Sequence, residues 1–414
     1  MFTKPSENSG RTGFSNDIHS TARTLLNGLP SNFQPFKFLL PENQGAKIIF
    51  FFNFAKWVSR PSLKIRQVNF SEQLIRWYEE NRRALPWRNT KDPYRIWLSE
   101  IILQQTRVAQ GLPYYERFLE RFPSVKELAL ASEEEVLKYW QGLGYYSRAR
   151  NLHAAAKIIH TRYKDVFPSA YPEIRALPGI GDYTAAAIAS FAYKLVYPVV
   201  DGNVIRFMCR LEGIFEAAGS PSCTKRIREM LQQRIDPLQP GLFNQAIMEF
   251  GALGCTPASP LCLQESGTCP FRTQCHALHH KMIERLPVKK KKEILPVLEI
   301  HYLLITDARG NLWLHKRGYE ALWRGMFDLP SLPEGWNGNN KLREAGAAEF
   351  LKHYTQVLTH RRLEAYFYRI PENSAPARKI LKMQENCLKI CPQEISRFAV
   401  PRVIERFLQD FNII

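Results

Sequence analysis

The most informative stretch of the chain reads Leu177-Pro178-Gly179-Ile180-Gly181-Asp182-Tyr183-Thr184-Ala185-Ala186-Ala187-Ile188. Two glycines bracket one apolar residue, and a helix of small residues follows at once. Glycine tolerates positive φ and lets another backbone approach closely. Asp182 is a good N-cap for the alanine-rich helix, and the exposed amides of such a turn suit a phosphate. An ordinary corner between two helices explains the same residues, so other stretches must discriminate.

Length and charge narrow the class of protein. The chain has 414 residues, which favours two or more domains. Its 57 Lys and Arg against 39 Asp and Glu give a net charge of +18, which favours a polyanionic partner such as nucleic acid. The apolar stretch 48–58 is too short to span a membrane and contains Lys56. We therefore expect a soluble protein.

The first two-thirds of the chain predict an N-terminal extension and a helical domain. Residues 1–66 are rich in Ser, Asn, Pro and Gly and are expected to be poorly ordered. Ser71 is expected to cap the first helix. From there to residue 284 we find helices joined by short loops and no convincing strand pattern. The expected domain at 67–284 is therefore all-α.

A change of pattern after a basic linker predicts a second domain. Lys289–Lys292 lies in the expected linker at 285–296, which is a solvated hinge with a secondary contribution to phosphate contact. Beyond it, residues 297–414 are expected to form a smaller α+β domain. Strand-like stretches are Leu298–Ile305, Leu312–His315 and Leu363–Tyr368, Asp307–Asn311 reads as a hairpin connection, and 341–352 and 400–411 look helical.

One carboxylate lies on an apolar helix face. Asp92 followed by Pro93 marks a helix start. In that helix Glu100 falls on the same face as Ile96 and Trp97. Desolvation there would raise the pKa of Glu100, as a general acid needs. An ion pair with a buried arginine such as Arg88 is the structural alternative, and the pattern alone favours it.

Two further stretches have both a structural and a functional interpretation. Asp201 ends an apolar run and begins a helix, where an N-cap is the simplest role for a lone Asp. Ser132-Glu133-Glu134-Glu135 is a capping box that opens a helix. That helix runs into Gly142–Arg150, whose glycines, tyrosines and arginines suit a nucleic-acid surface but also an ordinary helical turn.

Four of the eight cysteines form one cluster, Cys255-x6-Cys262-x6-Cys269-x5-Cys275. Four thiolates in one loop suit a [4Fe–4S] cluster or a structural zinc ion. The close C-x2-C pairs of zinc sites are missing, so the spacing favours iron and sulfur modestly. The uneven distribution favours a reducing compartment over a secreted disulfide scaffold.

Together these motifs resemble the helix-hairpin-helix DNA glycosylases with an iron–sulfur loop, and within them the A/G-specific adenine DNA glycosylases of the MutY family. The resemblance covers about residues 70–411. It rests on Leu85–Arg88, Ser99–Thr106, Gly142–Tyr146, Leu177–Ala185, Val200–Val204 and the cysteine loop. Each motif is weak alone, but six in register are specific.

The resemblance implies a reaction and its residues. Glu100 matches the general acid and Asp201 the catalytic aspartate, with Tyr183 and Asn203 in support. The substrate would be double-stranded DNA in which adenine is mispaired with 8-oxoguanine or guanine and is flipped into a pocket. Lyases of the endonuclease III type carry a nucleophilic Lys where this chain has Tyr183. We therefore expect a monofunctional glycosylase.

The resemblance also implies where DNA and cofactor bind. DNA contacts are expected at Arg88, Gln105, Thr106, Leu143, Tyr145, Gly179 and Gly181. In the C-terminal domain, Trp323–Pro330 resembles a Nudix-like domain, and Thr359 and His360 match a lesion-contacting loop that commonly reads Phe-Ser-His. Cys255, Cys262, Cys269 and Cys275 would hold a [4Fe–4S] cluster, although the family's middle spacing is two residues and this chain has six. We expect a monomer in the bacterial cytoplasm, associated with the nucleoid and with no membrane partner.

Three other functions compete. An endonuclease III-like glycosylase and AP lyase on oxidised pyrimidines is disfavoured by Tyr183 and the extra domain. A Nudix hydrolase needs a glutamate-rich helix, but only Arg343-Glu344 is present, followed by Ala345–Ala348. A DNA-binding protein without activity is disfavoured because Glu100 and Asp201 are both kept.

Overall fold

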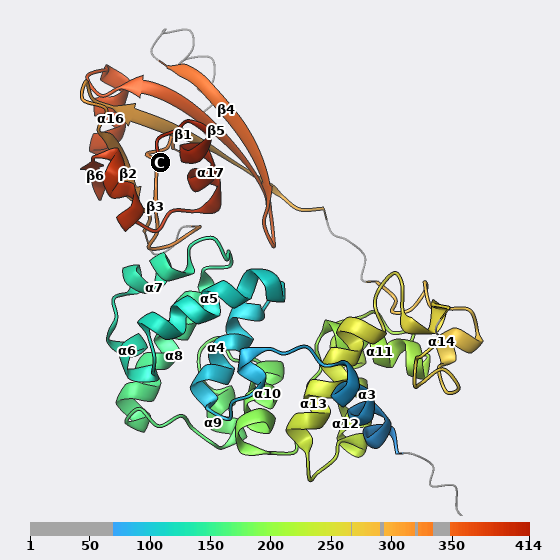
Figure 1. Cartoon of the computed structure of the whole chain (residues 1–414). Coiled ribbons are helices and arrows are strands. Elements are labelled where there is room, and N and C mark those ends of the chain that lie inside the picture. The colour runs from blue at the N-terminus through green and yellow to red at the C-terminus, as the bar shows by residue number, and fades with distance from the viewer. Residues whose placement is uncertain (1–68, 266, 290–293, 319–321, 334–347) are drawn as a thin grey trace, which may run out of the picture. The chain divides into compact units, whose positions relative to one another are not determined.

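The computed structural model describes residues 69–265, 267–289, 294–318, 322–333 and 348–414 (Figure 1). The expected N-terminal extension at 1–66 lies outside these ranges, as do linker residues 290–293 and residues 341–347 of an expected helix. None of the helices in the described ranges has the length and apolar character needed to cross a membrane.

The N-terminal domain is helical, as predicted, and its described residues contain no strand. Its helices are α3 (Phe70–Asn81), α4 (Pro93–Leu103), α5 (Val108–Arg121), α6 (Val125–Leu130), α7 (Glu133–Trp140), α8 (Ser147–Tyr163), α9 (Tyr171–Arg175), α10 (Asp182–Tyr193), α11 (Gly202–Glu212), α12 (Pro221–Arg234), α13 (Pro240–Glu249) and α14 (His276–His279), with short helical turns at Pro86–Arg88, Phe250–Gly254 and Leu261–Leu263. The predicted cap and proline at Asp92 and Pro93 start α4, where the Asp92 side chain accepts from the Tyr94 N–H at 2.9 Å.

Helix α10 joins two hydrophobic cores. Its Ala185, Ile188 and Ala189 pack in a core with α4 to α8, whereas Ala186 and Ala187 pack in a core with α3, α11, α12 and α13. Small side chains on every face let neighbouring helices approach α10 from both sides. The second core also contains Leu286, so the chain is still packed on the helical domain two residues into the expected linker.

Two predicted helix caps are wrong. Asp182 is the first residue of α10 rather than its cap, which is Gly181 in extended conformation. The Asp182 carboxylate instead pairs with Arg175 at 2.6 Å and Arg228 at 3.1 Å, interactions that outweigh local capping. The cap of α3 is Asn69, while the Ser71 hydroxyl donates to the Arg234 carbonyl.

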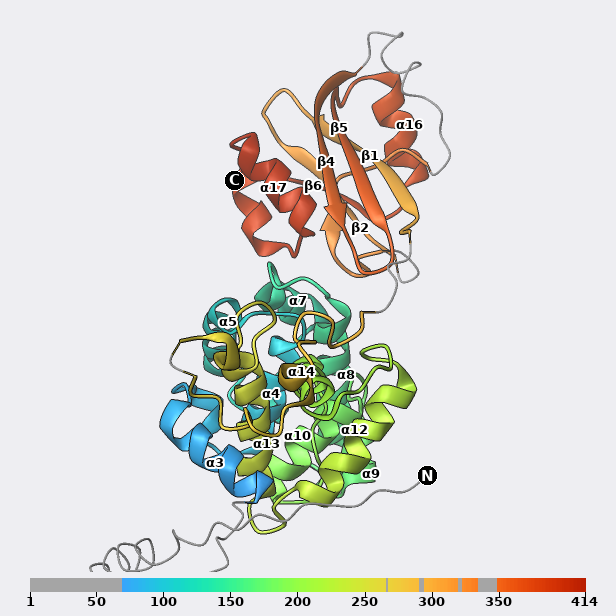
Figure 2. The same cartoon turned by 90° about the vertical axis from the view of Figure 1, so that its right-hand side faces the viewer.

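The C-terminal domain is α+β, as predicted. Its strands are β1 (Val297–Thr306), β2 (Leu312–Lys316), β3 (Phe327–Asp328), β4 (Glu349–Val357), β5 (Arg362–Pro371) and β6 (Cys387–Ile390). They form a sheet of order β3-β2-β1-β5-β4, with β6 paired to β2 and with β1 and β5 parallel. Helices α16 (Ala375–Met383) and α17 (Arg402–Asp410) pack on its opposite faces (Figure 2).

The helix expected at 400–411 is confirmed as α17, but the helix expected at 341–352 is wrong where it can be seen. Residues 349–352 belong to β4, which pairs antiparallel with β5 from Glu349↔Arg369 to Val357↔Arg362. As an edge strand, β4 exposes much of its surface. Polar and apolar residues therefore do not alternate strictly along β4, and it is such alternation that identifies a half-buried strand in a sequence.

Candidate active site

Four of the predicted site residues come together at the seam between the two cores. Glu100 on α4, Tyr183 on α10, and Asp201 and Asn203 at the start of α11 line one cavity of about 200 Å³. Arg88 also lines it, and Trp87, Met248 and Glu249 complete part of the wall. The cavity is formed from segments that are far apart in the sequence.

Glu100 is buried, with 7% of its surface exposed. Burial raises the pKa of Glu100 to about 7, the hydrogen bond from Tyr183 lowers it in part, and the nearby Asp201 carboxylate raises it further. The alternative ion pair with Arg88 is wrong, because Arg88 pairs with Glu249 at 2.6 Å. A carboxyl that titrates near neutral pH can hold a proton and donate it.

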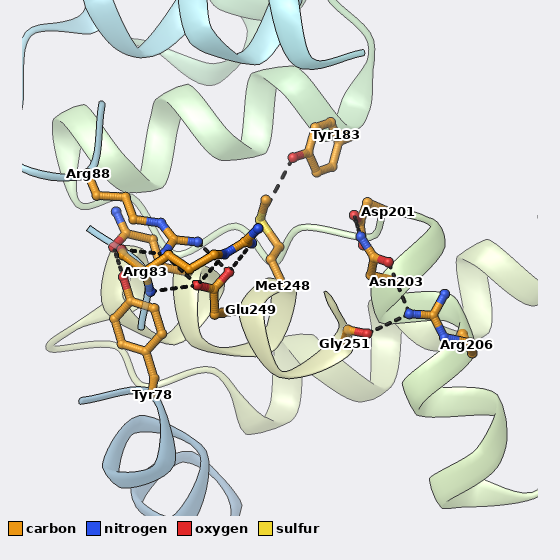
Figure 3. A network of polar contacts seen from close by, with 11 residues as sticks. Tyr78, Arg83, Arg88, Tyr183, Asp201, Asn203, Arg206, Met248, Glu249 and Gly251 are labelled. Atoms are coloured by element: carbon orange, nitrogen blue, oxygen red, sulfur yellow. Dashed lines mark hydrogen bonds and ion pairs between the residues drawn. The ribbon is translucent and has the colours of Figure 1, made fainter. Parts of the chain in front are cut away.

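Asp201 both caps a helix and faces the cavity. One of its carboxylate oxygens accepts from the Val204 N–H at 2.7 Å, and the other accepts from the Asn203 side-chain amide at 2.9 Å (Figure 3). Burial raises the pKa of Asp201, while these N–H donors act in the opposite direction. The predicted N-cap is therefore confirmed, and the same carboxylate lines the cavity.

Glu249 is a buried carboxylate in the cavity wall that the sequence analysis missed. Its side chain is 1% exposed and accepts from Arg83 at 2.5 Å and from Arg88 at 2.6 Å (Figure 3). Burial alone would raise the pKa of Glu249, but the hydrogen bonds from Arg88 and Arg83 lower it to about 2. Its place between Met248 and Phe250 is the same signal that singled out Glu100: a carboxylate in an apolar stretch.

A hydrogen-bonded chain leads from the cavity to the cysteine loop. The Asn203 side-chain oxygen accepts from Arg206 at 3.0 Å, and Arg206 also donates to the Gly251 carbonyl at 2.5 Å (Figure 3). A further N–H of Arg206 donates to the Cys255 carbonyl at 2.8 Å. A side chain at position 251 would collide with Asn203, whose backbone lies 2.8 Å from the Cβ position.

The four clustered cysteines lie within electrostatic range of one another. Burial raises the pKa of Cys262, Cys269 and Cys275, and the neighbouring thiols raise it further. The Arg210 guanidinium lies 3.6 Å from the Cys255 Sγ. Four soft sulfur donors fit an iron–sulfur cluster or zinc in chemical type. In the described ranges, however, no three His, Cys, Asp or Glu side chains are grouped in a way that could hold a metal ion.

The residues expected to contact DNA lie on several loops. Gln105 and Tyr145 have left-handed backbones, with φ of 57° and 49°, and Tyr145 is 48% exposed. Thr106 lies in the cavity wall and is partly buried. Leu143, expected beside Tyr145, is instead buried in the core.

The turn that contains Gly179 and Gly181 belongs to the helical domain, and the turn that contains Thr359 and His360 belongs to the C-terminal domain. Gly179 has φ of +75°, and a Cβ there would lie 2.7 Å from Asn151. In the described part of the chain, the amides of Gly179 and Gly181 have no hydrogen-bond acceptor. Thr359 and His360 are exposed in the turn between β4 and β5.

Comparison with known proteins defines the class first. Residues 98–233 match the model of the HhH-GPD superfamily of base excision DNA repair proteins, and residues 301–410 match the NUDIX domain. The adenine DNA glycosylase of Buchnera aphidicola from Acyrthosiphon pisum is 37% identical over 262 residues, which cover 63% of this chain and 73% of the relative. The human adenine DNA glycosylase is 40% identical over 226 residues, covering 52% of this chain and 41% of the relative.

The chain therefore belongs to the adenine DNA glycosylase family, and it is a base excision repair enzyme that acts on the N-glycosyl bond of adenine in DNA. Among solved structures, a thermostable thymine-DNA glycosylase is similar at 26% identity with a TM-score of 0.47, covering 51% of this chain and 95% of that one.

Proposed function

We propose that the enzyme hydrolyses the bond between adenine and deoxyribose where adenine is mispaired with 8-oxoguanine or guanine, and leaves an abasic site. The observation that carries this proposal is the buried Glu100 carboxyl, with a pKa of about 7, facing a small cavity beside a second carboxylate, Asp201. Adenine is a poor leaving group unless it is protonated. A proton donor on one side and a negative charge for the sugar on the other are what the reaction requires.

Glu100 is the general acid in this proposal. In its protonated form it donates to N7 of the extruded adenine and so improves the leaving group. Tyr183 lines the same cavity, where its hydroxyl lies 3.8 Å from the Met248 Sδ (Figure 3) and, as a hydrogen-bond donor to the Glu100 carboxyl, lowers the pKa of that group. Because Tyr183 has no amine, it cannot form an imine with the sugar, and we propose a monofunctional glycosylase.

Asp201 stabilises the positive charge that develops on the sugar as adenine leaves, or traps it briefly. The N–H groups of Val204 and Asn203 support its ionised form, and Asn203 fixes its orientation. Water then completes the hydrolysis. The environments separate the two roles: burial raises the pKa of Glu100 to about 7, whereas the Asp201 carboxylate accepts from the N–H groups of Val204 and Asn203.

The adenine would enter the cavity by rotation out of the duplex. Arg88 and Glu249 line that cavity, and their mutual ion pair fixes a wall of hydrogen-bonding groups for the edge of the base. The N–H donors of Arg83 and Arg88 occupy both carboxylate oxygens of Glu249, so this ion pair shapes the wall of the pocket that receives the adenine.

DNA would be held by the predicted contacts. The amides of Gly179 and Gly181, which have no acceptor in the described part of the chain, suit a backbone phosphate, and the exposed Tyr145 and Gln105 suit the gap left by the base. Thr359 and His360 would reach the lesion base from an exposed turn. The net charge of +18 supports binding to the phosphate backbone. Following the family resemblance, we propose a monomer acting on DNA at the bacterial nucleoid.

We also propose that Cys255, Cys262, Cys269 and Cys275 hold a [4Fe–4S] cluster. The donor set is purely thiol, and Arg210 lies against one sulfur, where it would favour the thiolate form. When bound, the cluster would cross-link the loop 255–275 and stabilise its fold. The wider middle spacing would be accommodated in the segment between Cys262 and Cys269.

A comparison of three duplexes tests the proposal. The enzyme should release adenine opposite 8-oxoguanine, leave adenine opposite thymine intact, and leave thymine glycol opposite adenine intact. Glu100→Gln should abolish adenine release while binding to the mispaired duplex is largely kept. Full activity of Glu100→Gln, or release of thymine glycol instead of adenine, would show the assignment to be wrong.

A further inference from the structure

A buried arginine on α8 takes no part in the chemistry described above. Arg148 is 8% exposed, and the hydrogen-bond partners of its guanidinium among the described residues are carbonyl and hydroxyl oxygens rather than carboxylates. Burying an unpaired charge is costly unless hydrogen bonds compensate for it. The two Nη atoms of Arg148 donate mainly to backbone carbonyls, while its Nε has no hydrogen-bond partner among the described residues.

One end of the guanidinium closes the helix that carries Glu100. Its Nη1 donates to the carbonyls of Ile101 and Ile102, both at 2.8 Å. Carbonyls in the last turn of a helix lack partners within the helix, and a positive charge there also interacts favourably with the helix dipole. Arg148 therefore fixes the backbone one and two residues beyond Glu100.

The other end of the guanidinium reaches two loops. Its Nη2 donates to the Gly144 carbonyl at 3.2 Å and to the Thr106 hydroxyl at 3.4 Å. Thr106 follows Gln105, and Gly144 precedes Tyr145. The Arg148 guanidinium also lies over the Tyr145 ring, 5.6 Å from its centroid.

Both loops contain a strained residue. Gln105 and Tyr145 have φ of 57° and 49°, which side chains larger than hydrogen rarely adopt. Such conformations cost free energy and persist only where the surroundings enforce them. Arg148 contacts the residue next to each of them and so supplies part of that enforcement.

We propose that Arg148 is a positioning residue that holds the loops of Gln105 and Tyr145 in fixed register with the helix carrying Glu100. The inference rests on the proposed function, in which these loops occupy the DNA gap while Glu100 meets the extruded base. Because one guanidinium holds both the two loops and the helix, the loops that enter the DNA gap stay at a constant distance from the Glu100 carboxyl. Arginine suits this task because its planar fork presents several donors at once, whereas lysine presents a single flexible ammonium.

The test compares Arg148→Lys, which keeps the charge, with Arg162→Lys, an exposed arginine on the same helix. Single-turnover adenine release from a duplex with adenine opposite 8-oxoguanine should fall about ten- to hundredfold in Arg148→Lys, the cost typical of slight misplacement. Affinity for the duplex should change little, and the assay is run well below the melting temperature of the variant, which loses hydrogen bonds to buried carbonyls. Arg162→Lys should match the wild type.

Base extrusion is measured separately with 2-aminopurine in place of the adenine, in a Glu100→Gln background that prevents release. Its emission should rise less on binding to Arg148→Lys than to the Glu100→Gln parent. Unchanged release and emission would overturn the proposal, and so would slower release explained wholly by a lower melting temperature with unchanged emission. If the wild type releases no adenine, the proposed function fails, whereas the emission comparison still tests Arg148.

Discussion

Replacement of Glu100 by glutamine should make the protein more stable at alkaline pH, although it removes the proposed acid. The pKa of Glu100 rises from 4.5 to about 7 on folding, mainly because of burial. The native state therefore binds more protons than the unfolded state between these values, and stability falls as pH rises through them. Above the native pKa the ionised carboxylate carries the full cost. Glutamine, which is neutral at every pH, does not incur it.

The size of the effect follows from the shift. Each pKa unit corresponds to about 1.4 kcal/mol, so ionised Glu100 costs on the order of 3 kcal/mol well above neutral pH. At a pH near 5.5 roughly half of that cost has already developed, because the unfolded carboxyl is ionised there. The stability of Glu100→Gln relative to the wild type should therefore increase by about 2 kcal/mol between a pH near 5.5 and one near 8.5.

Urea unfolding of the full chain, followed by tryptophan fluorescence, measures this difference. Glu116→Gln, on the exposed face of α5, is the matched control for loss of a carboxylate. A relative stability of Glu100→Gln that is independent of pH would refute the reasoning, because it would mean that Glu100 titrates alike in the folded and unfolded chain. A relative stability that falls with pH would show that the carboxylate is favourably paired.

Three further predictions follow from the same contacts. Tyr183→Phe removes the hydroxyl whose hydrogen bond lowers the pKa of Glu100. Adenine release should slow roughly tenfold, and its decline at alkaline pH should move to higher pH. A decline that moves to lower pH would contradict this. Glu249→Gln leaves Arg83 and Arg88 unpaired in the cavity wall and should lower the free energy of unfolding by about 3 kcal/mol at neutral pH. Because the native pKa of Glu249 is about 2, this loss should shrink as the pH falls below the pKa of Glu249 in the unfolded chain. Urea unfolding at two pH values measures the change. Borohydride added during turnover should trap no covalent adduct with DNA, since Tyr183 offers no amine; a stable adduct on a gel would indicate lyase chemistry.

Much of the fold could be predicted from local signals. Periodicity and caps such as Asp92-Pro93 are properties of neighbouring residues, and they identified the helical domain and the change to strands after the linker. Local rules failed where a distant partner decided the outcome. Asp182 was expected to cap α10, but Arg175 and Arg228 take its carboxylate, and β4 is a strand because β5 pairs with it.

The candidate site divides in the same way. Glu100 and Asp201 stand out because a carboxylate next to apolar residues is unusual in any local window. Glu249 carries the same local signal, but its pairing with Arg88 could not be predicted, because the two residues lie 161 positions apart in the chain. Arg148 was not recognised as a support for the site, since its main acceptors are backbone carbonyls some 46 residues away, which leave no trace in side-chain patterns.

The most direct test of the account is the pH dependence of adenine release in single turnover, with enzyme in excess over a duplex carrying adenine opposite 8-oxoguanine. The rate constant of the wild type should fall about tenfold per pH unit above the pKa of Glu100, about 7. Glu100→Gln should show no release above background at any pH. A wild-type rate constant that stays level to strongly alkaline pH would contradict the claim that buried, protonated Glu100 is the acid.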